Sequence, residues 1–400
     1  MTLEPPERFA DLDHAATTRL RPEALEAMTP FLGRRYGNPS GTHLLARDAV
    51  RAVDDARERI AGHLGCGPGD VVFTSGGTES DNHAISGGMP PRPGVPLCSA
   101  VEHHAVLDPV LVLGGRVIDV DDRGSVDLGH LAALLDELGT EVSVVSVMAA
   151  NNETGVVNDL DDRVEVVRSH EPDVPRTPVH TDAVQAAPWL DLRVAVAAAD
   201  LVSVSAHKLG GPKGVGALVV RHGVPLRPLL LGGGQERERR SGTSNVAGIV
   251  GFAAALDATV EQREVTTERI RALRDRLAKG LLAAIPDAAL TVLPSADTDT
   301  DTDRSGELSL LPGICHVCIP GIDSESLLFL AETEGVYAAA ASSCASGAQE
   351  SSHVLAAIGV DPVLAAGALR LSLGWDSTDA DVDLALEVLP AAVERVRSFG

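Results

Sequence analysis

The sequence predicts an α/β protein, with a large doubly wound domain around a mostly parallel sheet and a smaller α+β domain at the C-terminus. Residues 142–148 are apolar at nearly every position, which indicates a strand covered on both faces, and residues 201–205 are apolar and β-branched at alternate positions, which indicates a further strand. These runs alternate with segments of helical periodicity as far as about residue 262. Longer helices and a few separate strands follow. We therefore expect a large domain at 21–260, a small domain at 261–400, and a segment 1–20 that completes the small domain and the site.

Composition limits the partners that the chain can have. A chain of 400 residues with 44% hydrophobic content is long enough for sizeable cores. Its net charge of -24 disfavours nucleic acid and anionic membranes as direct partners. Because no apolar run is long enough to span a bilayer and the first ten residues lack a signal-peptide core, we expect a cytoplasmic protein.

The cysteines do not form a pattern typical of disulfides or metal ligands. Five scattered cysteines are an odd number, which fits reduced thiols better than a disulfide framework. Cys315 and Cys318 are spaced like a metal-binding pair, but they lie in a predicted strand at 313–319, where residues three apart point to opposite faces. No metal site is therefore expected.

The first predicted strand ends in an anion-binding turn. Residues 71–74 are apolar, and Ser75-Gly-Gly-Thr78 leads directly into a predicted helix. Backbone N–H groups of such a turn, with the Thr78 hydroxyl and the positive end of the helix dipole, favour a phosphate. The preceding amphipathic pattern at 47–65 predicts a scaffold helix that ends at Gly65.

Polar residues also follow the next strands. Glu102-His103-His104 comes after an apolar stretch, and one imidazole could lie flat on an aromatic ring or simply begin a helix. Residues 142–148 lead to a polar turn that contains Asn152, and residues 177–181 lead to Asp182 and Gln185. Because ligands of doubly wound proteins bind at the carboxyl ends of the strands, we expect these groups to share one pocket.

Lys208 follows the strand 201–205 and is one of only three lysines among the 33 basic residues, beside Lys213 and Lys279. A lysine that is retained where arginine otherwise carries the positive charge suggests a need for a deprotonatable amine. A desolvated amine attacks an aldehyde, and the usual aldehyde is pyridoxal phosphate. The alternative is a surface lysine in a glycine-rich turn.

The other polar groups suit the same cofactor. Asp182 can face the ring nitrogen of pyridoxal phosphate and keep it protonated, and Gln185 can donate to the ring hydroxyl. Ser205 and His207 flank Lys208 and can reach phosphate oxygens. A polar loop at 232–245 precedes a predicted apolar helix at 246–255. The loop is either a solvated charge run or an anion grip made by Arg240, Ser241 and Thr243.

Beyond residue 262 the sequence predicts helices at 264–282, 324–334 and 380–396 and strands at 313–319 and 368–373. Between the last two strands, Cys344 lies in a run of Ala, Ser and Gly residues. A cysteine among such small residues is accessible to reactants, unlike the apolar-flanked Cys98. The alternative is a small packed residue.

In this order the motifs resemble those of the cysteine desulfurases, pyridoxal-phosphate enzymes of fold type I in the class V aminotransferase group. The resemblance runs from Asp11-Leu-Asp-His-Ala-Ala-Thr-Thr18 to Arg370-Leu-Ser-Leu-Gly374. It implies Lys208, Cys344 and His103 as catalytic residues, with His103 stacked on the cofactor ring. It implies that the cofactor is held by Gly77, Thr78, His103, Asn152, Asp182, Gln185, Ser205, His207, Lys208 and, from the neighbouring subunit of a homodimer, Thr243. Asn38, Asn152 and Arg370 match the substrate-binding positions.

The resemblance implies an L-cysteine desulfurase, which leaves L-alanine and a persulfide on Cys344 for transfer to a sulfur-acceptor protein that the sequence does not identify. The flanks of Cys344 depart from the family pattern: Ala341-Ser-Ser precedes it, and Glu350-Ser-Ser-His353 follows it where the family usually has Glu-Pro-Ser-His. One alternative is a C–S lyase or selenocysteine lyase that does not need Cys344. Another is an inactive scaffold that binds sulfur carriers, which the intact Lys208, Asp182 and Gln185 disfavour.

Overall fold

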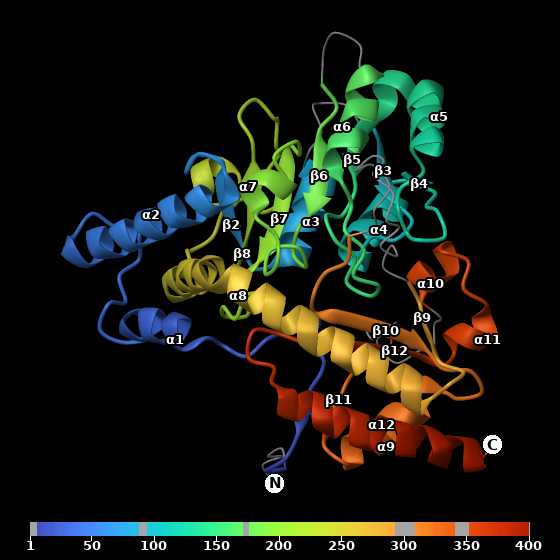
Figure 1. The fold of residues 1–400 in the computed structure, drawn as a ribbon. Coiled ribbons are helices and arrows are strands. Elements are labelled where there is room, and N and C mark those ends of the chain that lie inside the picture. The colour runs from blue at the N-terminus through green and yellow to red at the C-terminus, as the bar shows by residue number, and fades with distance from the viewer. Residues whose placement is uncertain (1–5, 88–93, 171–175, 293–308, 341–351, 400) are drawn as a thin grey trace.

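The structure, a computed structural model, describes residues 6–87, 94–170, 176–292, 309–340 and 352–399. A seven-stranded sheet with the order β2-β8-β7-β6-β5-β3-β4 lies at its centre (Figure 1). In this order the strands are Val71–Thr74, Gly216–Val220, Leu201–Ser205, Val179–Asp182, Val142–Ser146, Val95–Ser99 and Arg116–Ile118. Neighbouring strands are parallel except at β8, which runs antiparallel to β2 and β7. The predicted mostly parallel sheet is confirmed.

Helices pack on both faces of this sheet, as a doubly wound fold requires. On one face lie α2 Leu44–Leu64, α5 Leu128–Leu138, α6 Leu160–Ser169 and α7 Leu192–Ala195, and on the other lie α3 Gly77–Gly87 and α4 His104–Val112. Alternate residues of β2 show the division, because Val71 and Phe73 join the core of the first face and Val72 joins that of the second.

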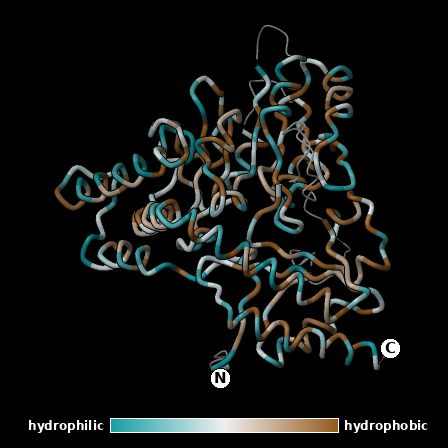
Figure 2. The backbone as a smooth tube through the Cα atoms, in the orientation of Figure 1, coloured by the Kyte–Doolittle hydropathy of each residue, from teal (hydrophilic) through white to brown (hydrophobic). Residues whose placement is uncertain are grey.

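Helix α2 follows the amphipathic pattern that its sequence predicts. Its buried residues recur every three or four positions, and Figure 2 shows hydrophobic and hydrophilic positions alternating along it. The helix ends at Gly65, whose φ of 63° and ψ of 39° form the expected left-handed C-cap. The short helix α1 Pro22–Met28 packs on the same core through Ala24.

Helix α8 is a single helix, Val246–Ala284, of 39 residues, where the sequence predicts two separate helices. Its first half is buried on nearly all sides, up to Thr259, and its second half buries only one stripe that includes Ile270 and Leu277. The intervening polar residues change the face that is buried without interrupting the backbone hydrogen bonds, since none of them is Gly or Pro. The prediction of a helix break there is wrong.

The second half of α8 covers a second hydrophobic core. This core contains α9 Ser324–Thr333, α12 Asp379–Phe399 and the antiparallel sheet β12-β10-β9, formed by Ala368–Ser372, Ile314–Cys318 and Ala289–Leu290. Cys315 lies in this core and Cys318 in a separate cluster, so the two thiols face opposite sides of β10 as predicted. The short helices α10 His353–Ala357 and α11 Pro362–Ala365 precede β12. The domain boundary near residue 260 stays a prediction.

The N-terminal segment, residues 10–19, joins the second core although it begins the chain. Strand β1 Ala10–Asp11 pairs parallel with β11 Val336–Tyr337, and Leu12 is fully buried in the second core. From there the segment passes along the edge of β12 toward the large sheet. Among the described helices, none is both long enough and apolar enough to cross a bilayer.

Candidate active site

A cavity of about 280 Å³ lies at the carboxyl ends of the central strands, where the sequence predicts the site. It is lined by Ala15, Ala16, Gly77, Thr78, Asp81, His103, Met148, Asn152, Asp182, Val184, Gln185, Ser205, His207, Lys208 and Arg370. All of the predicted cofactor residues except Thr243 are among them, together with Arg370. The residues come from seven separate parts of the chain, and five of these parts follow strands of the central sheet, whose carboxyl ends lie at one edge.

Lys208 ends the 3-10 turn Ala206–Lys208, which follows β7 directly. Gly210, with a φ of 80°, allows the chain to reverse after this turn and enter β8. The Lys208 ammonium donates to the carbonyl oxygens of Ala15 at 2.5 Å and Ala16 at 2.8 Å, so the N-terminal segment holds the amine in the cavity.

Asp182 is the last residue of β6 and is only 6% exposed. One carboxylate oxygen accepts a hydrogen bond of 2.8 Å from the backbone N–H of Val184. Burial raises the pKa of Asp182, and the Val184 N–H and the Lys208 ammonium oppose that rise. A second buried carboxyl, Asp81 on α3, lines the same cavity, and burial together with the charge of Asp182 raises its pKa well above the usual range. Asp182 is therefore the carboxylate that carries the charge.

The start of α3 and the end of β7 form an anion pocket at one end of the cavity. Gly76 has a φ of 151°, and a Cβ on Gly77 would lie 2.9 Å from Val184 Cγ2, so both positions need glycine. The Ser205 hydroxyl is buried, lines the cavity and has no hydrogen-bond partner among the described residues. An unpaired buried hydroxyl beside a helix N-terminus is suited to a phosphate oxygen.

Two histidines at the cavity are neutral near pH 7. Burial, and then the nearby Lys208 ammonium, lower the pKa of His103 to about 4, and the same two causes lower that of His207 to about 4. His103 Nδ1 accepts from the backbone N–H of Ala105 at 3.1 Å, so this residue caps α4 while its ring lines the cavity. His207 Nδ1 lies 3.1 Å from the Thr17 hydroxyl. Both histidines therefore present uncharged rings.

Gln185 also contacts the N-terminal segment, since its side-chain amide donates to the Ala15 carbonyl at 2.8 Å. On the opposite side of the cavity lies Arg370, which is 4% exposed. It donates from Nη1 to the Asn152 carbonyl at 3.2 Å and from Nη2 to Asp13 at 2.9 Å. The cavity thus has an amine, a carboxylate, an anion pocket and a guanidinium.

The lining fits pyridoxal phosphate. The unpaired Ser205 hydroxyl and the glycine turn suit its phosphate, the buried Asp182 carboxylate suits its ring nitrogen, and the Lys208 amine suits its aldehyde. An uncharged His103 ring can lie against an aromatic ring without placing a positive charge beside it.

Three predicted site residues do not line this cavity. Asn38 is exposed in the loop before α2, and its side chain accepts from the backbone N–H of Ser40. Thr243 lines a separate cavity of about 120 Å³ near the start of α8. In the same loop Arg240 pairs with Glu79 at 2.7 Å, so its charge is already compensated. Cys344 lies outside the described residues.

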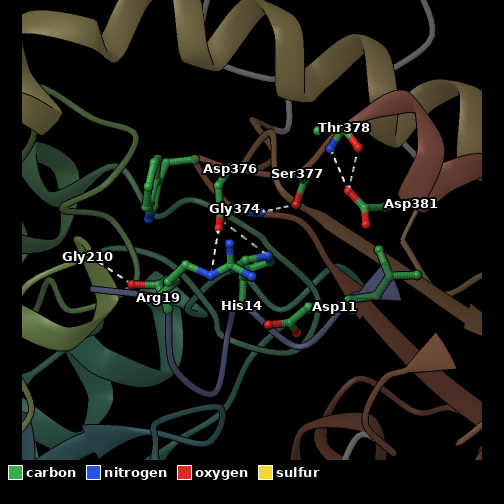
Figure 3. A network of polar contacts seen from close by, with 12 residues as sticks. Asp11, His14, Arg19, Gly210, Gly374, Asp376, Ser377, Thr378 and Asp381 are labelled. Carbon is green, nitrogen blue, oxygen red and sulfur yellow. Dashed lines mark hydrogen bonds and ion pairs between the residues drawn. The ribbon is translucent and has the colours of Figure 1, made fainter. Parts of the chain in front are cut away.

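The sequence predicts that the segment 1–20 completes the site, but it does not predict the backbone carbonyls through which this segment contacts Lys208. Two residues, His14 and Arg19, approach Asp376, with distances of 3.8 and 3.5 Å (Figure 3). Ser372 holds the segment at its other side, where its hydroxyl accepts from the Ala15 N–H at 2.8 Å. The polar run Asp11–Thr18 was the available signal, but side-chain patterns do not reveal which carbonyls a lysine contacts.

Comparison with known proteins identifies the family to which the chain belongs. The aminotransferase class-V family matches residues 11–385. The chain is 43% identical to an IscS-like cysteine desulfurase of Mycobacterium tuberculosis, with 97% of each protein covered, and 37% identical to the cysteine desulfurase IscS of Dictyoglomus turgidum, with 97% of this chain and 95% of that one covered. A solved NifS-like protein superposes with a TM-score of 0.85 at 35% identity, over 97% of this chain and 100% of the other. The structure titled "SspA in complex with cysteine" has a TM-score of 0.73 at 29% identity, over 91% of this chain and 98% of that one. Because the family model matches residues 11–385 and these relatives match over nearly the full length, the chain belongs to the aminotransferase class-V family.

Proposed function

We propose that this protein is a pyridoxal-phosphate-dependent L-cysteine desulfurase. The observation that carries the proposal is the cavity at the strand ends, in which Lys208, Asp182 and Arg370 meet the Ser205 hydroxyl, which has no partner in the part of the chain that the structure describes. The relatives named cysteine desulfurase, 37% to 43% identical over nearly the whole chain, support the same reaction.

The residues of the cavity have different roles in binding the cofactor and the substrate. Lys208 would hold the cofactor, with Gly77, Thr78, Ser205 and His207 at its phosphate and Asp182 at its ring nitrogen. When bound, pyridoxal phosphate supplies an electron sink for the bonds at the substrate α-carbon. Arg370 binds the substrate carboxylate and so fixes the orientation of the α-carbon.

Lys208 is also the base that moves the α-proton. Its amine sits between the Asp182 side of the cavity and the carbonyls of Ala15 and Ala16, which accept its N–H groups and hold it in place. The neutral rings of His103 and His207 add no positive charge that would oppose Lys208 when it takes up a proton.

Sulfur transfer uses Cys344, by resemblance to the family. Its thiolate attacks the substrate sulfur, an S–S bond forms, and the bond between the substrate sulfur and its β-carbon breaks. The carbon keeps the electron pair and takes up a proton, so that L-cysteine and the Cys344 thiol become L-alanine and a Cys344 persulfide. The sulfur is oxidised and the carbon reduced, and no further oxidant is needed. An acceptor protein then takes the persulfide sulfur.

Borohydride reduction of the cofactor-loaded protein, followed by peptide mapping, tests the attachment site. The pyridoxyl mass is expected on the peptide with Lys208, and a label on Lys213 or Lys279 would refute the assignment. Cys344→Ala separates a desulfurase from a lyase. It is expected to keep the cofactor absorbance but to release no alanine from cysteine, whereas release at the wild-type rate would establish the lyase reaction.

We also propose that the enzyme is a homodimer in which Thr243 completes the site of the partner subunit. Its place in a separate cavity, away from the cofactor residues of its own chain, supports this arrangement. Mixing Lys208→Ala with Thr243→Ala protein is expected to restore part of the activity, because mixed dimers contain one intact site. Full activity of a monomer in light scattering would contradict it.

A further inference from the structure

Arg370 is held rigidly at its backbone. It lies in the middle of β12, and its N–H and C=O both bond to Ala339, at 2.8 and 3.3 Å. On the other side it stands opposite His316 of β10. Because its backbone bonds go to Ala339, this is a non-hydrogen-bonded pair, in which side chains lie closest together. The backbone from which the guanidinium extends is therefore fixed on both sides.

The guanidinium is already partly occupied. Nη2 donates to Asp13 and Nη1 to the Asn152 carbonyl, whereas Nε is buried and has no partner among the described residues. Asp13 belongs to the N-terminal segment and its side chain is 30% exposed. A carboxylate that enters the cavity thus meets free N–H groups on a cation whose charge Asp13 already balances.

Two other titratable groups near Arg370 do not neutralise its positive charge at neutral pH. Glu153 is buried, and burial raises its pKa to about 7, so a large fraction of it is protonated. His316 is buried, and burial followed by the charge of Arg370 lowers its pKa to about 3, so it is neutral. Among the described residues, Asp13 is the carboxylate that pairs with Arg370.

We propose that Asp13 is an internal counter-ion that competes with the substrate carboxylate for Arg370 and so sets how tightly amino acids bind. This inference rests on the proposed function, in which Arg370 binds that carboxylate. The substrate must exchange with Asp13, and part of its binding energy is used in the exchange. On the product side Asp13 returns to Arg370, which favours release of L-alanine. The residue positions and tunes Arg370 without touching the reacting atoms.

Asp13→Asn tests this with L-alanine as the probe. The dissociation constant is measured on the cofactor-loaded enzyme from the change in visible absorbance, without turnover. Removal of one charge next to a mostly buried guanidinium should tighten L-alanine binding by about three- to tenfold. Ethylamine, which is alanine without its carboxylate, should bind unchanged. The KM for cysteine should fall, and kcat should not rise, because product release becomes slower.

Two variants separate charge from structure. Asp11→Asn removes a charge from the same segment, at a side chain that accepts from the Asp13 N–H at 3.1 Å, and should leave L-alanine binding unchanged. Asp13→Glu keeps the charge and should bind L-alanine less tightly than Asp13→Asn. Asp13→Ser removes the same charge as Asp13→Asn and carries the same expectation, in case the asparagine disturbs the segment.

The outcomes are distinct for the two proposals. Equal or weaker L-alanine binding in Asp13→Asn and Asp13→Ser, with the cofactor absorbance intact, overturns the role of Asp13. If the wild-type enzyme binds L-alanine and ethylamine equally well, Arg370 does not bind the carboxylate, and the proposed function loses its substrate site.

Discussion

Glu236 is expected to contribute far more to stability than a residue of a polar loop usually does. Glu236→Ala removes a carboxylate that accepts from Arg57 twice, at 2.7 and 2.8 Å, and from the backbone N–H of Phe73 at 3.1 Å. The side chains of the pair are only 10% and 7% exposed. The substitution therefore leaves a guanidinium and a strand N–H buried without this acceptor.

The magnitude follows from this burial. Removing one partner of a buried ion pair costs about 3–5 kcal/mol, because the remaining charge is desolvated without compensation. Glu236, Arg237 and Glu238 all have positive φ, at 50°, 57° and 63°, and each such residue costs about 1–2 kcal/mol. Once the carboxylate is lost, this turn can relax and recover part of the cost. We therefore expect a net loss of about 3 kcal/mol.

Urea unfolding of the cofactor-free protein measures this loss as a lower midpoint. The matched control is Glu387→Ala, which breaks the Arg8–Glu387 pair, whose side chains are 64% and 62% exposed. An exposed pair of this kind contributes less than about 1 kcal/mol. Equal shifts of the midpoint for Glu236→Ala and Glu387→Ala would refute the reasoning, because burial would then not decide the value of the pair.

Three further predictions concern the site and its supports. Glu102 is fully buried, and burial raises its pKa to about 8. The stability that it permits is therefore fully present below its unfolded pKa near 4.5 and is lost as the pH rises through 8. Glu102→Gln, which resembles the protonated form, should unfold at a higher urea concentration than wild type at pH 8.5 and at nearly the same urea concentration at pH 4. Ser205→Ala should weaken cofactor binding about tenfold, measured by fluorescence titration, with an unchanged unfolding midpoint of the cofactor-free protein. Gly374→Ala should lower that midpoint because its Cβ would lie 2.4 Å from His14 Nδ1, while Gly33→Ala, with nothing within 4 Å, should not; equal midpoints for the two would contradict the packing argument.

The strand-end residues could be predicted because the geometry of a parallel sheet is general. Asp182 and Lys208 each come at the end of a predicted strand, and the carboxyl ends of neighbouring parallel strands must lie at one edge, so their meeting required no knowledge of distant contacts. Arg240 shows the limit. In the sequence, Arg240 with its Ser and Thr neighbours resembles an anion-binding loop. The structure shows that Arg240 pairs with Glu79, which is 161 positions away and which the local motif does not reveal.

The contacts that the N-terminal segment makes could not be predicted for a similar reason. Its role depends on the Ala15 and Ala16 carbonyls and on Ser372, which is 357 positions from Ala15. Because every residue has a backbone carbonyl, the sequence does not indicate which carbonyls Lys208 contacts. The single helix α8 was missed because a polar stretch was interpreted as a boundary, although helix continuity depends on the backbone and not on which face is buried.

The pairing of residues 12–15 with Ser372 also has a consequence for biosynthesis. Residues Leu12 to Ala15 are held by Ser372, which accepts from the His14 N–H and donates its own N–H to the Leu12 carbonyl. While the ribosome is still making residues before 372, the large sheet can already pack, but the carbonyls that hold Lys208 have no anchor. Because Arg370 also comes from β12, the cavity acquires its carboxylate-binding group at the same late moment. A nascent chain therefore cannot assemble a complete site until residue 372 has been synthesised, and truncation within β12 should remove both supports together.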